Sequence, residues 1–190
     1  MTDRTPTRTL HPLTDGVYVW LEPGGGMGRA NAGVVVDDDG VTVVDALMVR
    51  SQWTPFRTAV VALGHPMRRL VLTSSRIDHV GGSKAFERAA VLASPQTSTL
   101  LEGEMPVDAY RTFMPEFADE LDDLVEVGTR QVTHLVVDAA PITPRCEVLP
   151  VTGHTQGDLL VLVPDVDVCF AGDIAAFGVT PLGFQGDPAA

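Results

Sequence analysis

The sequence has little positive charge and few cysteines, and both deficits narrow its possible roles. It contains 13 Lys and Arg residues against 25 Asp and Glu residues, which gives a formal net charge of −12. Phosphate backbones repel such a chain and no basic patch is visible, so we expect no nucleic-acid partner. Two cysteines are too few for a disulfide framework. Because Cys146 and Cys169 each lie in an apolar, strand-like run, we expect both to be small buried side chains.

Long apolar runs are also lacking. Uncharged apolar stretches such as residues 159–164 are far shorter than a membrane span. The first twelve residues, MTDRTPTRTLHP, contain charge and threonine but no apolar segment typical of a signal peptide. We therefore expect a cytoplasmic protein that does not bind membranes.

The chain does contain enough apolar material for one domain. It has 190 residues, of which 45% are hydrophobic, and this length is sufficient to bury a sizeable core. No linker and no repeat of fixed period are visible. We predict a single domain over residues 1–190, with a loose N-terminal tail at residues 1–12.

Alternating apolar residues and turn residues predict the strands, and helical spacing predicts the helices. Strands are expected at 16–22, 31–37, 41–46, 68–74, 91–95, 133–138, 146–151, 158–164 and 167–173. Helices are expected at 52–64, 81–90 and 96–127, the last broken near Pro106 and Pro115. The DDG turn predicts that 31–37 and 41–46 form a hairpin. This order of elements indicates a layered α/β protein with mixed sheets.

Polar groups follow three of the predicted strands directly. They are Asp78-His79 after 68–74, Gly153-His154-Thr155 after 146–151, and Gly172-Asp173 at the end of the last strand. Strand ends are the usual place for a site built on a sheet. Carboxylates and imidazoles from three such ends are the ligands that zinc or a similar metal needs.

At these positions the sequence resembles the metallo-β-lactamase fold superfamily. The family signature is a Thr-His-x-His-x-Asp-His loop followed by Gly-Gly, and the chain has TSSRIDH from Thr73, followed by VGG. Further matches are GHTQG from Gly153, the strand ending in Gly172-Asp173, NAG from Asn31, and Asp45 after an apolar strand. The resemblance covers about residues 13–184. It implies an αββα sandwich of two mixed sheets flanked by helices, with the site at one edge of the facing sheets.

The departures from the family pattern concern the first metal position. In the family, the first two histidines of the loop and the GHT histidine hold one metal. Here Ser74 and Arg76 replace the two loop histidines, and His154 alone remains. A guanidinium is permanently charged and has no lone pair to give a metal. We therefore expect the first metal position to be lost.

The second metal position is better preserved. Its family ligands are the loop Asp and His, the bridging Asp and a final histidine. Asp78, His79 and Asp173 match the first three, whereas no histidine follows His154. Either the C-terminal end is incomplete or the protein lacks that ligand.

The resemblance implies a hydrolase of a small-molecule ester, thioester, lactone or amide, with at most one metal. Zinc is the expected ion, with iron or manganese as alternatives, and its ligands would be Asp78, His79, His154 and Asp173. Asp78 and His154 are the expected catalytic residues. Arg76 and Ser74 are expected to contact the substrate.

The competing hypothesis is a metal-free, non-catalytic homologue that binds a small anionic ligand through Arg76, or that acts as a subunit. Arg76 itself has two interpretations, a clamp for an anionic substrate or an internal partner of Asp78, Asp173 or Asp45 in place of a metal. A homo-oligomer is compatible with the sequence.

Overall fold

A computed structural model describes residues 8–176 of the chain. Eleven strands are present in this part: β1 (Leu10–Thr14), β2 (Val17–Trp20), β3 (Ala32–Asp37), β4 (Gly40–Val44), β5 (Met67–Val71), β6 (Ala90–Ala93), β7 (His134–Leu135), β8 (Ala140–Pro141), β9 (Glu147–Val151), β10 (Asp158–Val163) and β11 (Val168–Phe170). The α-helices are α1 (Arg50–Ala62), α2 (Ile77–Val80), α3 (Pro95–Glu102), α4 (Val107–Phe113) and α5 (Ala118–Val127). Short 3-10 helices are η1 (Gly81–Phe86), η2 (Pro115–Phe117), η3 (Pro164–Val166) and η4 (Gly172–Ile174).

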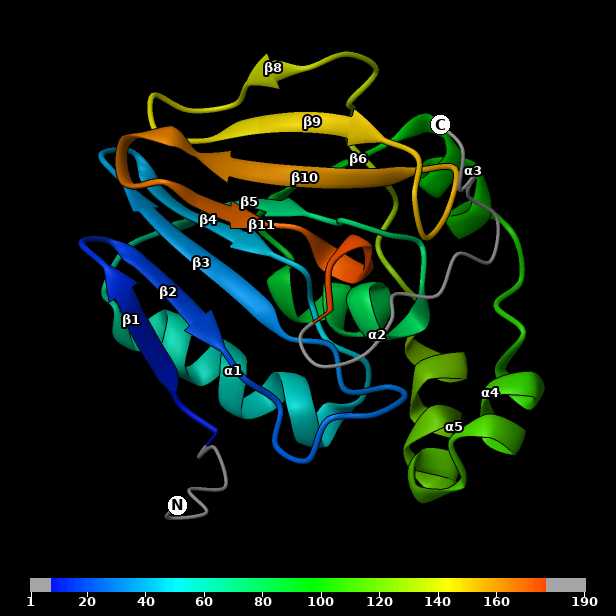
Figure 1. Cartoon of the computed structure of the whole chain (residues 1–190). Coiled ribbons are helices and arrows are strands. Elements are labelled where there is room, and N and C mark those ends of the chain that lie inside the picture. Colours follow the sequence, from blue (N-terminus) through cyan, green and yellow to red (C-terminus); the bar gives the residue numbers. More distant parts are fainter. Residues whose placement is uncertain (1–7, 177–190) are drawn as a thin grey trace.

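The strands form two sheets (Figure 1). The larger sheet has the order β1-β2-β3-β4-β5-β6-β7 and is mixed: β1 to β4 pair antiparallel, and β4 to β7 pair parallel. The smaller sheet, β11-β10-β9-β8, is antiparallel throughout. The predicted hairpin of β3 and β4 is confirmed, because Gly33 pairs with Val44 and Asp37 with Gly40.

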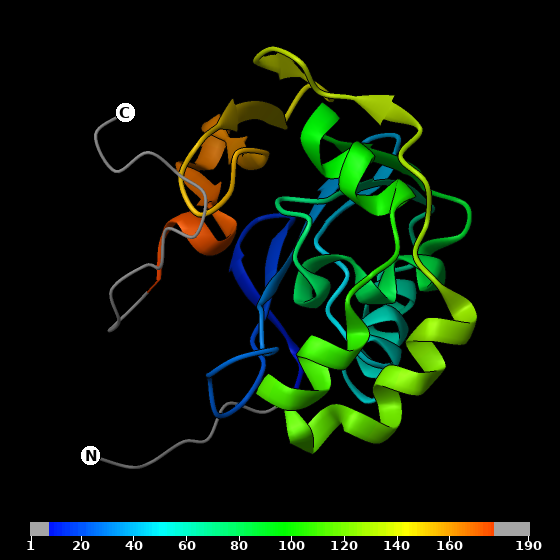
Figure 2. The same ribbon diagram turned by 90° about the vertical axis from the view of Figure 1, so that its right-hand side faces the viewer.

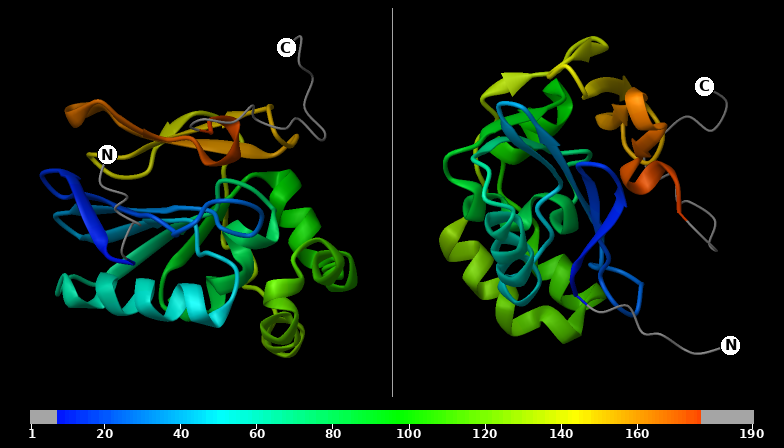
Figure 3. Two further views of the ribbon diagram at one scale, coloured as in Figure 1. Left: turned by 60° about the horizontal axis from the view of Figure 1, so that its bottom comes forward. Right: turned by 90° about the vertical axis from the view of Figure 1, so that its left-hand side faces the viewer.

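The two sheets face each other, and α1 covers the outer face of the larger sheet (Figure 3). The smaller sheet and η4 lie on one side of the larger sheet, and α1, α4 and α5 lie on the other (Figure 2). The expected layered α/β arrangement is therefore present. Within residues 8–176, no helix is both long and apolar enough to cross a membrane.

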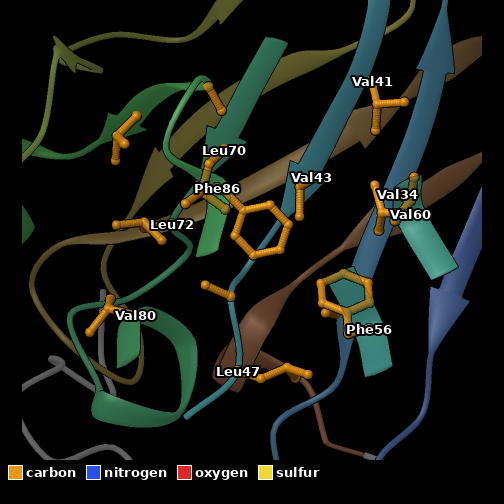
Figure 4. Close-up of a cluster of buried hydrophobic side chains, with 14 of the residues drawn as sticks. Val34, Val41, Val43, Leu47, Phe56, Val60, Leu70, Leu72, Val80 and Phe86 are labelled. Atoms are coloured by element: carbon orange, nitrogen blue, oxygen red, sulfur yellow. The ribbon is translucent and has the colours of Figure 1, made fainter. Parts of the chain in front are cut away.

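The central strands are buried on both faces because each face meets another layer. In β4, Val41 and Val43 belong to the core cluster under α1, whereas Val44 belongs to the cluster between the sheets. Figure 4 shows Phe56 of α1 and Phe86 of η1 among the valines and leucines of the first cluster. Their ring centroids are 5.9 Å apart. Such two-sided burial suits the continuous apolar runs of these strands.

Several expected details of the fold are wrong. Residues 10–12 belong to β1, which pairs with β2, and so the loose tail does not extend to residue 12. The helix expected over 81–90 is replaced by η1, and the regular helix α2 precedes it. Cys146 is buried as expected, but Cys169 is exposed.

The segment after β4 and the segment after α2 pack backbone against backbone. Ala46 N donates to His79 O at 2.7 Å, and Gly82 N donates to Leu47 O at 2.9 Å. A Cβ atom on Gly81 or Gly82 would collide with the carbonyl oxygen of Met48 or Ala46 respectively. The two glycines after His79 therefore let the loop that contains Asp78 and His79 lie directly on the end of β4.

Replacing Gly82 with alanine is expected to lower the free energy of unfolding by about 1–3 kcal/mol, because the added methyl group overpacks against fixed backbone atoms. Denaturant titration followed by circular dichroism measures the loss. Gly103→Ala is the matched control, because a Cβ there first meets Leu100 O at 3.5 Å, an ordinary contact. We expect a change within about 0.5 kcal/mol for the control. Equal losses in the two variants would contradict this role of Gly82.

Candidate functional site

The three predicted polar groups meet at one edge of the facing sheets. Asp78 and His79 lie in α2 after β5, His154 lies in the loop between β9 and β10, and Asp173 lies in η4 after β11. His79 Nε2 lies 3.1 Å from Asp173 Oδ2, and His154 Nε2 lies 3.5 Å from the same oxygen. Asp173 is therefore the residue at which the contributions of the two sheets join.

Asp45 fixes the loop on the larger sheet. It follows β4 with a positive φ of 63° and is buried. Its carboxylate accepts hydrogen bonds from Thr73 N at 2.8 Å and Thr73 Oγ1 at 2.6 Å. His79 Nδ1 lies 2.8 Å from Asp45 Oδ2. One buried carboxylate thus orients both Thr73, at the start of the loop, and His79, at its end.

His79 presents its second nitrogen to Asp173. Nε2 is buried and lies 3.1 Å from Asp173 Oδ2, with which it forms an ion pair when the ring is protonated. With Nδ1–H donating to Asp45, Nε2 carries the lone pair of the neutral ring. Burial lowers the pKa of His79, but the charges of Asp45, Asp173 and Asp78 outweigh it and raise this pKa well above its ordinary value.

The pKa values of the two remaining carboxylates, Asp78 and Asp173, shift in opposite directions. Burial raises the pKa of Asp78, with His79 opposing part of the effect. Burial also acts to raise the pKa of Asp173, but His79, His154 and Arg76 lower it below its ordinary value. Asp173 is therefore the carboxylate that the local cations keep ionised.

Arg76 reaches across to the smaller sheet. Its Nε donates a hydrogen bond to His154 Nε2 at 3.3 Å. The guanidinium also acts on the hydroxyl of Tyr110 in α4, where burial raises the pKa and Arg76 lowers it in part. Sequence analysis missed Tyr110, because a tyrosine in a helical run gives no signal that its hydroxyl turns toward a loop 34 residues earlier.

Local hydrogen bonds hold the loops that present Ser74 and His154. Ser74 is buried, and its Oγ accepts from Arg76 N at 3.3 Å, so the hydroxyl supports the loop backbone. Thr155 N donates to Asp158 Oδ2 at 2.7 Å, which closes the turn after His154. Sequence analysis also missed Asp158. The Thr-x-x-Asp spacing is a signal that could have identified it.

The residues at the first metal position do not fit a cation. The Nε2 atom of His154 already accepts a hydrogen bond from a guanidinium, and Ser74 Oγ faces the loop backbone. At the second position the donor atoms fit better, because the buried, unpartnered Nε2 of His79 faces the carboxylate of Asp173. Over residues 8–176, however, no group of three or more His, Cys, Asp or Glu side chains is close enough together to hold a metal ion. At the second position the described residues thus bring two potential ligands close together, His79 and Asp173.

Replacing Asp45 with alanine is expected to lower the free energy of unfolding by about 3–5 kcal/mol, because it leaves buried donors of Thr73 and His79 unpaired. Denaturant titration measures this loss. Asp39→Ala is the matched control, since Asp39 pairs with Arg69 at the surface. Such surface pairs contribute about 0–1 kcal/mol. A loss at Asp45 no larger than that at Asp39 would show that the buried carboxylate does not organise the loop.

Three comparisons place the chain among known proteins. Uncharacterized protein YobT of Bacillus subtilis (strain 168) is 26% identical over 147 residues, which cover 75% of this chain and 60% of YobT. The chain thus spans less than two thirds of that relative. The crystal structure of the DIM-1 metallo-beta-lactamase matches with a TM-score of 0.70 and 16% identity, over 95% of this chain and 77% of DIM-1.

The metallo-beta-lactamase FIM-1 from Pseudomonas aeruginosa, in its mono-zinc form, matches with a TM-score of 0.68 and 18% identity, over 94% of this chain and 76% of FIM-1. These likenesses establish the two-sheet fold. The model of the metallo-beta-lactamase superfamily matches residues 25–187, which is most of the sequence. The chain belongs to the metallo-beta-lactamase superfamily.

Proposed function

We propose that the protein is a small-molecule hydrolase that acts with one metal ion at the second position. The observation that carries the proposal is the setting of His79. Its Nδ1 is held by the buried carboxylate of Asp45, and its buried Nε2 has no hydrogen-bond partner and faces Asp173. A histidine whose far nitrogen is fixed by a carboxylate is the usual form of a metal ligand.

Zinc is the proposed ion, with iron or manganese as alternatives; the close pair His79 and Asp173 would hold it, and Asp78 would have to move to join them. Bound there, it supplies a Lewis acid that activates water for attack on an ester, thioester, lactone or amide. That FIM-1 was crystallised in a mono-zinc form supports the idea that this fold accommodates a single ion.

The protein's own residues have separate tasks in this proposal. Asp45 sets the ring orientation of His79, and Asp173 joins the larger sheet's loop to His154. Arg76 is only partly buried, and its planar fork suits a carboxylate or phosphate group of the substrate. Tyr110 lies beside that fork and would limit the size of the group that it binds.

A second candidate function is a metal-free protein that binds a small anionic molecule through Arg76. The contact of Arg76 Nε with His154 Nε2 favours it, because a cation already occupies part of the site. Under this hypothesis Arg76 and a proton on His79 would balance two of the three carboxylates, and burial would favour a proton on the third, Asp78. The two candidate functions differ in metal content, which can be measured directly.

The protein, purified without chelator and dialysed against a slight excess of zinc, is expected to retain about one ion per chain by elemental analysis. Asp173→Asn is expected to weaken zinc binding by at least about 10-fold, and hydrolysis of a panel of small esters, thioesters and lactones by at least about 100-fold, because it removes a ligand charge. Competition with a chromogenic chelator measures the affinity.

Asp165→Asn is the matched control, because Asp165 pairs with Arg145 at the surface and lies in the turn before β11. We expect it to retain both zinc and activity. A protein that takes up no zinc, hydrolyses none of the panel and shows no stability change in chelator would overturn the hydrolase proposal and support the metal-free candidate.

A further inference from the structure

We infer that Arg76 takes the place of the metal ion at the first position, so that this site holds no more than one metal. The inference concerns the same residues as the proposed function, but it stands whether or not the second position is filled. It rests on the contacts of His154 with Arg76 and with Asp173.

The Nε2 atom of His154 has one lone pair to offer. An arginine N–H is always a donor, so His154 Nε2 must be the acceptor in the 3.3 Å contact with Arg76 Nε. A metal at the first position would need that same lone pair. The guanidinium and the metal therefore compete for one atom. The guanidinium has the advantage, because it is part of the loop and is always present at the site.

Asp173 lies close to the same nitrogen. Its Oδ2 lies 3.5 Å from His154 Nε2 and 3.1 Å from His79 Nε2, and Arg76 is among the cations that act on it. Arg76 and Asp173 therefore both lie at His154 Nε2, the atom that a metal at the first position would bind.

Ser74 stands at the position of the other replaced histidine. Its buried hydroxyl accepts from Arg76 N, at the residue that precedes α2. Ser74 therefore stabilises the backbone from which the guanidinium projects. The two substitutions act together: one removes a ligand and supports the loop, and the other supplies the replacement cation.

The test restores the two histidines. The double variant Ser74→His/Arg76→His is expected to bind one more zinc ion per chain than the wild type, because both missing imidazoles then join His154. Zinc is counted by elemental analysis after desalting, and its affinity is measured by competition with a chromogenic chelator. Circular dichroism establishes that the variant is folded.

The matched control is Ser98→His/Arg57→His, which makes the same exchange of residue types on α3 and α1, away from the site. We expect it to bind as much zinc as the wild type. A wild type that binds two ions at the site, or a folded double variant that gains none over this control, would overturn the inference. A wild type with no zinc would instead count against the proposed function, and a gain of one ion in the variant would still support the inference.

A second measurement keeps the inference testable if the double variant does not fold. The ring nitrogens of His154 are followed by nuclear magnetic resonance while zinc is added to the wild type and to Arg76→Gln. In the wild type we expect no metal-induced shift at His154 Nε2, whatever happens at His79. A shift at His154 Nε2 in the wild type, with the stoichiometry of zinc uptake, would show that the metal displaces Arg76 and would overturn the inference.

Discussion

The buried carboxylate of Asp45 is the constraint on which the rest of the site depends. It stands at the end of β4, the strand in the middle of the larger sheet, and bonds to Thr73 and His79 at both ends of the next loop. Thr73 in turn accepts through its carbonyl oxygen from Leu159 N at 2.9 Å, which ties the loop to β10 of the smaller sheet. The relative position of the two sheets at this edge therefore depends on a few buried polar bonds as well as on apolar packing.

Sequence alone predicted the elements whose patterns are local. The hairpin of β3 and β4 follows from two apolar runs around DDG, and Asp78, His154 and Asp173 could be placed at strand ends because parallel and facing strands end at a common edge. β1 was missed because residues 10–14, LHPLT, alternate poorly, and its pairing with β2 decides their structure. Cys169 was misjudged because a run of three apolar residues does not reveal which face of β11 is covered.

The direction of long side chains was beyond sequence reasoning. The sequence left two interpretations of Arg76 open. In the structure Arg76 donates to His154, which lies 78 positions later in the chain and belongs to the other sheet. Tyr110 was invisible for the same reason, since its helix is one of several short ones whose orientation is set by packing against the apolar cluster around Met48 and Ile77. The motif shows which metal-ligating residues the sequence contains. It does not show that Arg76, in the place of a histidine, becomes the hydrogen-bond partner of His154.

The site brings together more negative than positive side chains. Asp45, Asp78 and Asp173 bring three carboxylates to one place, and Arg76 offsets one of them. A divalent cation would balance the other two. Without a metal, the surrounding carboxylates raise the pKa of His79, whereas the pKa of Asp78 is raised mainly by burial.

Metal and protons therefore compete for the same residues, because a ligand must lose its proton to bind. Arg76 opposes both, because its permanent positive charge would repel a divalent ion and also lowers the pKa of Asp173. At an effective dielectric constant of about 20, two unit charges about 4 Å apart interact by roughly 4 kcal/mol. The replacement of two histidines by Ser74 and Arg76 consequently does more than remove ligands: it also places a fixed positive charge at the site.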